Sequence, residues 1–272
     1  MFVIFPVLQT IYISFFSPAG DFTGLENYYD VLSSREILNL EGFPKYPPLG
    51  ALIHNLIWIL IHLPLSLFSG LALAIILRDV KGASIVKSII FLGMVTPLIV
   101  GGIMLRFTFD KQVGILNGFL TSVGLENLTR TWTADPETGL FAEIFGGVWL
   151  WTGFSMILYS AGLATIPRDY FEAAKIDGAS PFRTFYRITL PLLRPVTQVI
   201  MTMTILWELK IFDLVYIVNT QGGPGKSTTV LALEMYLKFA SRLYNQAAVI
   251  ATFLTLLTLI VAIGMVRYMV KK

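Results

Sequence analysis

Residues 166–195 read IPRDYFEAAKIDGASPFRTFYRITLPLLRP, and this stretch decides how the rest of the chain is interpreted. Its first half predicts a short helix over residues 168–176, directly after the proline that ends an apolar segment. Such a helix places Arg168, Glu172 and Lys175 on one face, because residues three and four apart are neighbours on a helix surface. The segment therefore resembles a surface helix, although apolar sequence lies on both sides of it.

The second half of the stretch carries the signals of a turn and another short helix. Gly178 suits the left-handed position that closes a helix. Ser180 followed by Pro181 suits the start of a helix that ends near residue 188. Pro191 and the proline four residues later are expected to break the chain before the next apolar segment. The sequence therefore predicts a helix–turn–helix.

These two short helices are amphipathic. The second would place Phe182, Phe185 and Tyr186 on one side and its two arginines on another. We expect the rest of the protein to hold the apolar side while the charged rim faces solution, so that the pair lies along a membrane surface. An interfacial loop with no binding partner is the alternative.

The composition indicates an all-α integral membrane protein. Hydrophobic residues make up 55% of the 272 residues and charged residues only 14%, and the mean hydropathy is +0.72. Soluble domains carry about 25% charged residues. A single soluble core cannot hide this much apolar surface. The absence of cysteine excludes disulfides and thiol catalysis.

Six apolar segments predict a bundle of six transmembrane helices. They cover residues 1–17, 50–77, 84–107, 141–166, 195–219 and 244–268. A span needs roughly 20 residues of helix, and the first segment is too short. It also opens without a basic residue, so we expect the chain to begin part-way into its first span. Pro64 and Pro97 lie mid-segment and are candidate kinks.

The distribution of lysine and arginine predicts the orientation of the bundle. Basic residues are dense in loops 78–88 and 167–195 and in the tail that ends with Lys271 and Lys272. Loops 18–49 and 107–140 are more acidic and poorer in basic residues. The first set is therefore expected in the cytoplasm and the second outside.

Residues 219–229 read NTQGGPGKSTT and look at first like a phosphate-binding loop. That motif needs a glycine five residues before the Gly-Lys-Ser, and the residue there is Thr220. The preceding segment is a predicted span instead of a soluble strand, and the loop is expected outside. We therefore interpret the glycines and Pro224 as a tight turn at the end of a span.

The stretch quoted first resembles the EAA loop of ABC-importer permeases. The matching residues are Glu172, Ala173, Ala174, Asp177, Gly178, Ile188, Leu190 and Pro191. In that family the loop is the coupling helix, which docks in a cleft of a separate ATPase subunit and converts nucleotide-driven closure into rocking of the spans. The resemblance implies that Glu172 contacts the ATPase and holds the helix end, and that Gly178 allows the turn.

A second motif resembles the carbohydrate-uptake branch of these permeases, the maltose, trehalose and glycerol-phosphate type. It is F-D-x(6)-T-x-G-G-P, which begins at Phe212 and Asp213. Residues 110–120 and 244–265 resemble the same branch. The resemblance covers most of the chain from about residue 50, so we expect a first span with an external loop over 1–49 and a transmembrane domain of the type I importer kind over 50–272.

The resemblance also implies the partners and the function. The chain would form half of the path of a carbohydrate importer in a prokaryotic cell membrane, beside a second permease, two ATPase subunits and an external sugar-binding protein. ATP and magnesium would bind the ATPase, so this chain would be no enzyme and hold no cofactor, metal or nucleic acid. An ion-gradient-driven carrier is the alternative, since it would explain six spans and the charges near residue 208, although no inverted repeat is visible.

The fifth segment contains candidates for the substrate path, because a sugar site combines stacking aromatics with polar groups. They are Trp207, Glu208, Phe212, Asp213 and Asn219. The alternative is that Glu208 and Lys210 pair with neighbouring helices.

Two further features allow both a functional and a packing interpretation. Trp149 and Trp151 could line the path or pack in the core. His54 and His62 share one face of the second segment, where packing or hydrogen bonding is a better explanation than a metal site.

Overall fold

The computed structural model describes residues 2–42, 45 and 48–270, and regular structure in these residues is helical except for one bridge between Phe16 and Phe22. Lys271 and Lys272 lie outside the described residues. The α-helices are α1 Ile4–Ile13, α2 Glu26–Leu32, α3 Ala51–Ile76, α4 Ala83–Val95, α5 Leu98–Thr108, α6 Ile115–Ser122, α7 Gly139–Ala164, α8 Arg168–Ile176, α9 Pro181–Thr184, α10 Leu190–Leu192, α11 Arg194–Leu209, α12 Asp213–Val218, α13 Leu231–Ala240 and α14 Tyr244–Val270.

The six predicted apolar segments are all found as helices, but only three of them are straight spans. Helices α3, α7 and α14 are each long and apolar enough to cross a membrane. The third segment is α4 and α5, which meet at an angle of 100°. The bend lies at Pro97, which keeps the residue before it out of the helical conformation, and Thr96 has a ψ of 125°. Pro64, by contrast, lies inside the uninterrupted α3.

The first and fifth segments also differ from simple spans. Helix α1 has 10 residues, fewer than a span needs. The fifth segment is α11 and the short α12, with a break between them after Leu209. At its other end, α11 bends by 62° from the helical run Pro181–Leu192.

The predicted break at Pro191 is wrong, because the helical run continues through it to Leu192. A π-helical turn over Phe185–Thr189 precedes the proline, and the Leu190 amide bonds to the carbonyl five residues back, at Phe185. Such a bulge loosens the backbone where a proline would otherwise clash with the preceding turn. The chain bends after Leu192 instead.

Helix α7 is the centre of the bundle and packs against α3, α4, α5 and α11. Its glycines allow this, because small residues let membrane helices approach closely. A Cβ at Gly147 would lie 2.9 Å from the ring of Trp58 on α3. A Cβ at Gly153 would lie 2.9 Å from the backbone of Phe91 on α4.

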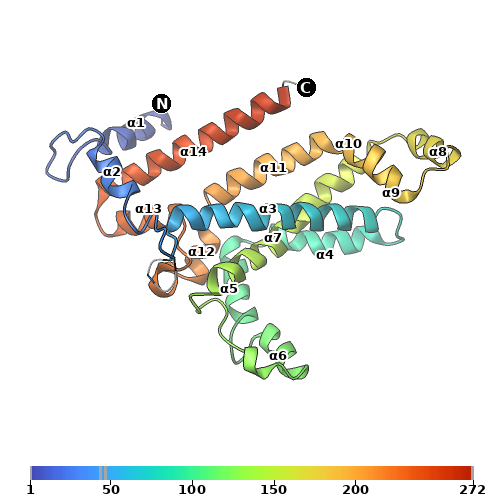
Figure 1. Ribbon diagram of the computed structural model, residues 1–272, viewed down its shortest axis with the longest axis horizontal. Coiled ribbons are helices and arrows are strands. Elements are labelled where there is room, and N and C mark those ends of the chain that lie inside the picture. The colour runs from blue at the N-terminus through green and yellow to red at the C-terminus, as the bar shows by residue number, and fades with distance from the viewer. Residues whose placement is uncertain (1, 43–44, 46–47, 271–272) are drawn as a thin grey trace.

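The two ends of the bundle carry different elements (Figure 1). Helices α8 and α9 lie at the end of α3 where the chain turns into α4, whereas α2 and α13 lie at its opposite end. Helices α5 and α6 form an arm that projects from the bundle. The basic loops predicted to be cytoplasmic are therefore gathered at one end, away from the loop after α1.

Candidate functional site

The turn between α8 and α9 has the geometry that the sequence predicts. Gly178 has a φ of +67°, and a Cβ there would have no heavy atom within 4 Å, so its conformation and not its size makes glycine necessary. The Ala179 amide bonds to the carbonyl of Ala174 at 2.9 Å, which closes α8 as a Schellman motif. Ser180 caps α9 by accepting a hydrogen bond from the amide of Arg183.

One face of α8 is turned toward the α3–α4 connection. Arg168, Phe171, Glu172 and Lys175 line a cavity of about 790 Å³ between these elements. The guanidinium of Arg78, just after α3, lies 4.6 Å from the ring centroid of Phe171. Glu172 is exposed to solvent as well as lining this cavity.

The apolar side chains of this region divide into two groups. Phe185 packs against the core formed by α3, α7 and α11, as expected. The expectation is wrong for Phe182, which is 73% exposed, and for Tyr186, which is 56% exposed and whose ring centroid lies 5.1 Å from that of Phe182. Residues 182 and 186 are one helical turn apart, so they share a face that Phe185 does not. Ile176, at 87% exposure, adds to this uncovered apolar surface.

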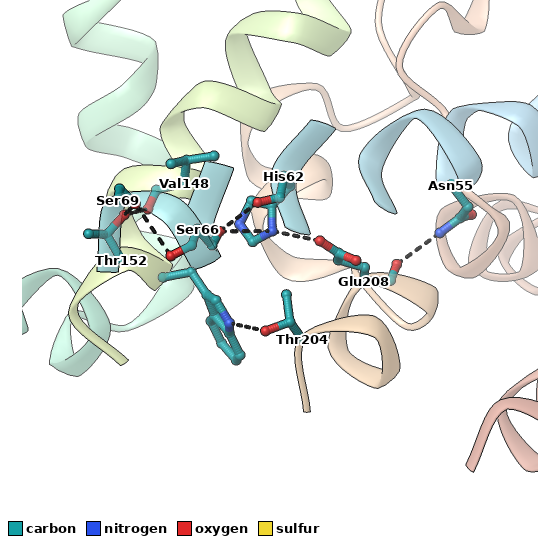
Figure 2. Close-up of polar contacts among 9 residues, drawn as sticks. Asn55, His62, Ser66, Ser69, Val148, Thr152, Thr204 and Glu208 are labelled. Atoms are coloured by element: carbon teal, nitrogen blue, oxygen red, sulfur yellow. Dashed lines mark hydrogen bonds and ion pairs between the residues drawn. The ribbon is translucent and has the colours of Figure 1, made fainter. Parts of the chain in front are cut away.

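Glu208 is held by α3 instead of facing an open path (Figure 2). Its carboxylate accepts a hydrogen bond of 2.7 Å from Nδ1 of His62, and both side chains are fully buried. The Glu208 carbonyl accepts a 2.9 Å bond from the side-chain amide of Asn55. Asn55 in turn accepts from the Leu231 amide at the start of α13. This is the helix-pairing alternative raised from the sequence.

Trp207 takes part in an aromatic stack between α7 and α11. Its ring stacks on that of Trp151 with centroids 4.5 Å apart and planes at 20°. Trp151 is fixed by a 2.9 Å hydrogen bond from its indole nitrogen to Thr204, and its ring also lies 5.1 Å from Phe154. Both tryptophans are partly exposed. Part of the stack is therefore left uncovered by the chain itself.

The other candidates for the path lie elsewhere. Phe212 stacks on Tyr216 at 5.2 Å and lines a separate cavity of about 470 Å³ beside α13 and α14. Asp213 is exposed. Asn219 donates to the carbonyl of Thr133 and to the carboxylate of Glu143, at 2.9 and 2.8 Å. The five candidates therefore do not converge on one pocket within this chain.

Glu143 was missed from the sequence. It is fully buried near the start of α7. The sequence feature that points to it is a lone carboxylate inside an apolar segment, where ionisable groups are costly and need partners.

The lysine of the Gly-Lys-Ser sequence is engaged by a carboxylate. The ammonium of Lys226 lies 3.1 and 3.0 Å from the two carboxylate oxygens of Glu234, which is fully buried in α13. Lys238 lies 3.7 Å from the same carboxylate. The preceding residues make the predicted turn, with Gly222 and Gly223 at positive φ.

The two histidines bind different elements. His62 binds Glu208, and Nδ1 of His54 lies 2.7 Å from the carbonyl of Thr229. Thr229 is in the loop between α12 and α13, named the outer loop because the charge distribution predicts it outside. Both therefore serve as hydrogen-bonding residues of α3.

Comparison with known proteins places the chain in a family. Residues 46–272 match the family model described as "Binding-protein-dependent transport system inner membrane component". The probable ABC transporter permease protein PH1038 of Pyrococcus horikoshii is 58% identical, over 98% of this chain and 92% of its own length. The trehalose/maltose transport system permease protein MalF of Thermococcus litoralis is 34% identical, over 86% of this chain and 76% of its own length.

The fold has counterparts among solved structures. A bacterial ABC transporter involved in the import of the acidic polysaccharide alginate matches with a TM-score of 0.82 and 19% identity, over 99% of this chain and 90% of the other. These findings favour an importer permease over the ion-gradient-driven carrier. The chain belongs to the binding-protein-dependent transport system inner membrane components, the permease subunits of ABC importers.

Proposed function

We propose that this permease imports a carbohydrate and that the stack of Trp151 and Trp207 forms part of its path. The stack is the observation that carries this assignment, since sugars present flat C–H faces that pack on aromatic rings, and polar groups then fix their orientation. Relatives named for saccharides support the class. Besides the trehalose/maltose permease, they include the arabinooligosaccharides transport system permease protein AraP of Bacillus subtilis, which is 30% identical over 97% of this chain and 82% of its own length.

In this proposal the chain forms half of an alternating-access path beside a second permease subunit. A sugar-binding protein delivers the substrate from outside. The partly exposed edge of the tryptophan stack would be completed by the second permease. Phe212, Asp213 and Asn219 remain candidates nearer the outer mouth. Glu208 would not contact the sugar itself, because its carboxylate is bound to His62.

The movement driven by ATP hydrolysis would be transmitted to the path through α8 and α9. A dimer of ATPase subunits binds ATP and magnesium, and this chain binds neither nucleotide nor nucleic acid. The uncovered side chains of Ile176, Phe182 and Tyr186 suit a hydrophobic cleft on such a partner. Glu172 and Gly178 keep the roles that the EAA loop implies. The engaged Lys226 supports the absence of a nucleotide site in the outer loop.

The first test is purification of the chain from its native membrane in a gentle detergent, with mass spectrometry of the bound proteins. A second permease, a P-loop ATPase and a binding protein that carries a sugar are expected. A chain that transports solute by itself would refute the proposal.

The tryptophan stack is tested by uptake in the reconstituted transporter. Trp207→Ala and Trp151→Ala should each lower uptake roughly fivefold, since an aromatic contact contributes about 1 kcal/mol. Trp149→Ala is the matched control, because Trp149 is an exposed tryptophan on the same helix and outside the stack. An equal loss in all three variants would show that the stack has no special role.

A further inference from the structure

The cavity of about 790 Å³ beside α8 has an unusual charge. It lies where α3 and α7 end and α4 begins, and the apolar part of its lining includes Ala74, Leu163 and Ile166. The charged residues that line it are Arg78, Lys87, Arg168, Lys175, Asp79 and Glu172. Four cations and two carboxylates leave a net charge of +2.

These cations have no carboxylate partner within the described part of the chain. Among the described residues, no ion pair within 4.0 Å includes any of the four, in contrast to Lys226 and Lys238 at the other end of the bundle. Arg78 contacts the ring of Phe171 instead. Four cations around one cavity repel one another, and an anion placed between them would relieve that repulsion.

The helices next to the cavity, α3 and α4, carry exposed apolar side chains. Ile76, the last residue of α3, is exposed, as are Ile85 and Ile89 on α4. These large side chains lie on the two helices that supply Arg78 and Lys87. An amphiphile with a negatively charged head and hydrocarbon tails therefore suits this position better than a soluble anion, which would use only the charges. Basic pockets between the cytoplasmic ends of membrane helices bind phospholipid headgroups in this way.

The cavity shares Glu172 with the surface proposed to meet the ATPase, but its cations and the uncovered apolar side chains belong to different parts of the helix pair. Its lining residues on α8 recur at positions 168, 171, 172 and 175, which form a single helix face. Ile176, Phe182 and Tyr186 do not line it. A lipid in the cavity and a protein partner on the uncovered side chains would thus occupy different faces of the helix pair.

We propose that this cavity binds the phosphate of an anionic membrane phospholipid, with Arg78, Lys87, Arg168 and Lys175 as its ligands. The bound phosphate would link α8, which carries Arg168 and Lys175, to the α3–α4 connection, which carries Arg78. The site needs no ATPase, binding protein or sugar, so its test is independent of the proposed function.

The test uses the full purified chain in a neutral detergent, with native mass spectrometry of its complexes. Dioleoylphosphatidylglycerol is titrated against dioleoylphosphatidylcholine, which has the same tails and a zwitterionic head. The wild-type chain should retain phosphatidylglycerol preferentially. The double variant Lys87→Gln/Arg168→Gln should bind it about thirtyfold more weakly, because each Lys or Arg near an anionic headgroup contributes about fivefold.

Two further variants separate the site from general effects. Arg183→Gln/Arg187→Gln removes the same charge from exposed positions outside the cavity and should leave the preference unchanged. Lys87→Arg/Arg168→Lys keeps the charges and should retain binding, which distinguishes lost charge from lost folding. Equal binding of the two lipids by the wild type, or equal loss in both glutamine variants, would overturn the proposal. Displacement of the lipid by millimolar inorganic phosphate would also overturn it, in favour of a site for a soluble anion.

Discussion

The pair formed by His62 and Glu208 yields the sharpest prediction for this protein. Both side chains are fully buried, and the Nδ1–Oε1 distance is 2.7 Å. The other carboxylate oxygen, Oε2, has no hydrogen-bond partner within the described part of the chain. Removing one member of such a pair leaves a buried polar group without its main partner. The Glu208→Leu variant should therefore lose about 3 kcal/mol of stability, where the ranges for an orphaned buried donor and for a broken buried ion pair meet.

A double-mutant cycle separates this pair from its surroundings. His62→Leu/Glu208→Leu removes both polar groups, and replacing a buried pair by apolar residues is often nearly neutral. The double variant should thus be at least as stable as either single variant, with a coupling free energy of about 2 kcal/mol. Asp213→Leu is the control, because Asp213 is an exposed carboxylate close by and its loss should change stability by less than about 0.5 kcal/mol.

The assay is thermal unfolding of the purified chain, followed by tryptophan fluorescence. The ring centroids of Trp58 and Trp207 lie 5.6 and 5.3 Å from that of His62, so their emission reports on this region. A loss of 3 kcal/mol corresponds to a Tm lowered by roughly 6–12 °C in a chain of about this size. A Glu208→Leu variant that melts within 2 °C of the wild type would refute the reasoning, and so would additive losses in the double variant.

Three other substitutions test the helix–turn–helix and the outer loop. Gly178→Leu forces a side chain into the left-handed region, at a cost of about 1–2 kcal/mol. Both Gly178→Leu and Glu172→Arg should abolish uptake while the protein stays in the membrane, and normal uptake by either would contradict the coupling role. Gly118→Leu, at an open position of α6, is the control. Lys226→Met leaves the buried Glu234 without its closest cation and should lower the Tm, whereas the exposed Lys111→Met should not. Neither Lys226→Met nor the wild type should bind a fluorescent ATP analogue, and binding by the wild type that the variant loses would restore the phosphate-loop interpretation.

Local signals predicted the helix–turn–helix because its determinants lie within a few residues of one another. Gly178 and Ser180 act on adjacent backbone, so their residue types specify the turn and the cap without any tertiary contact. The exposure of Phe182 and the continuity of the helix through Pro191 were not predictable in that way. The first depends on where the bundle ends, and the second depends on a π-helical turn that no single residue specifies.

The path residues were harder to predict because their partners are distant in the sequence. Glu208 binds a histidine 146 positions away, and Trp207 stacks on a tryptophan from another segment. Composition and spacing within one apolar segment show that a carboxylate is buried there, but the choice between a partner helix and an open path depends on how the segments pack. The same limit explains why Glu143 was missed, although Asn219, which binds it, was selected.

The contacts of α3 explain why the His62–Glu208 pair matters beyond stability. Helix α11 starts directly after the helix–turn–helix and ends at Leu209, and α3 holds that end through both the side chain and the carbonyl of Glu208. Asn55, which binds the carbonyl, also binds the start of α13, and His54 binds the outer loop at Thr229. A displacement of α8 and α9 that moves α11 must therefore carry α3 and the outer loop with it, unless these buried bonds break. In Glu208→Leu the bond to His62 is lost, but the bond from Asn55 to the backbone carbonyl of residue 208 can remain. Loss of uptake at temperatures where this variant is still folded would show that the Asn55 bond alone does not transmit the movement of α11 to the outer loop. The coupling would then depend on the His62–Glu208 pair.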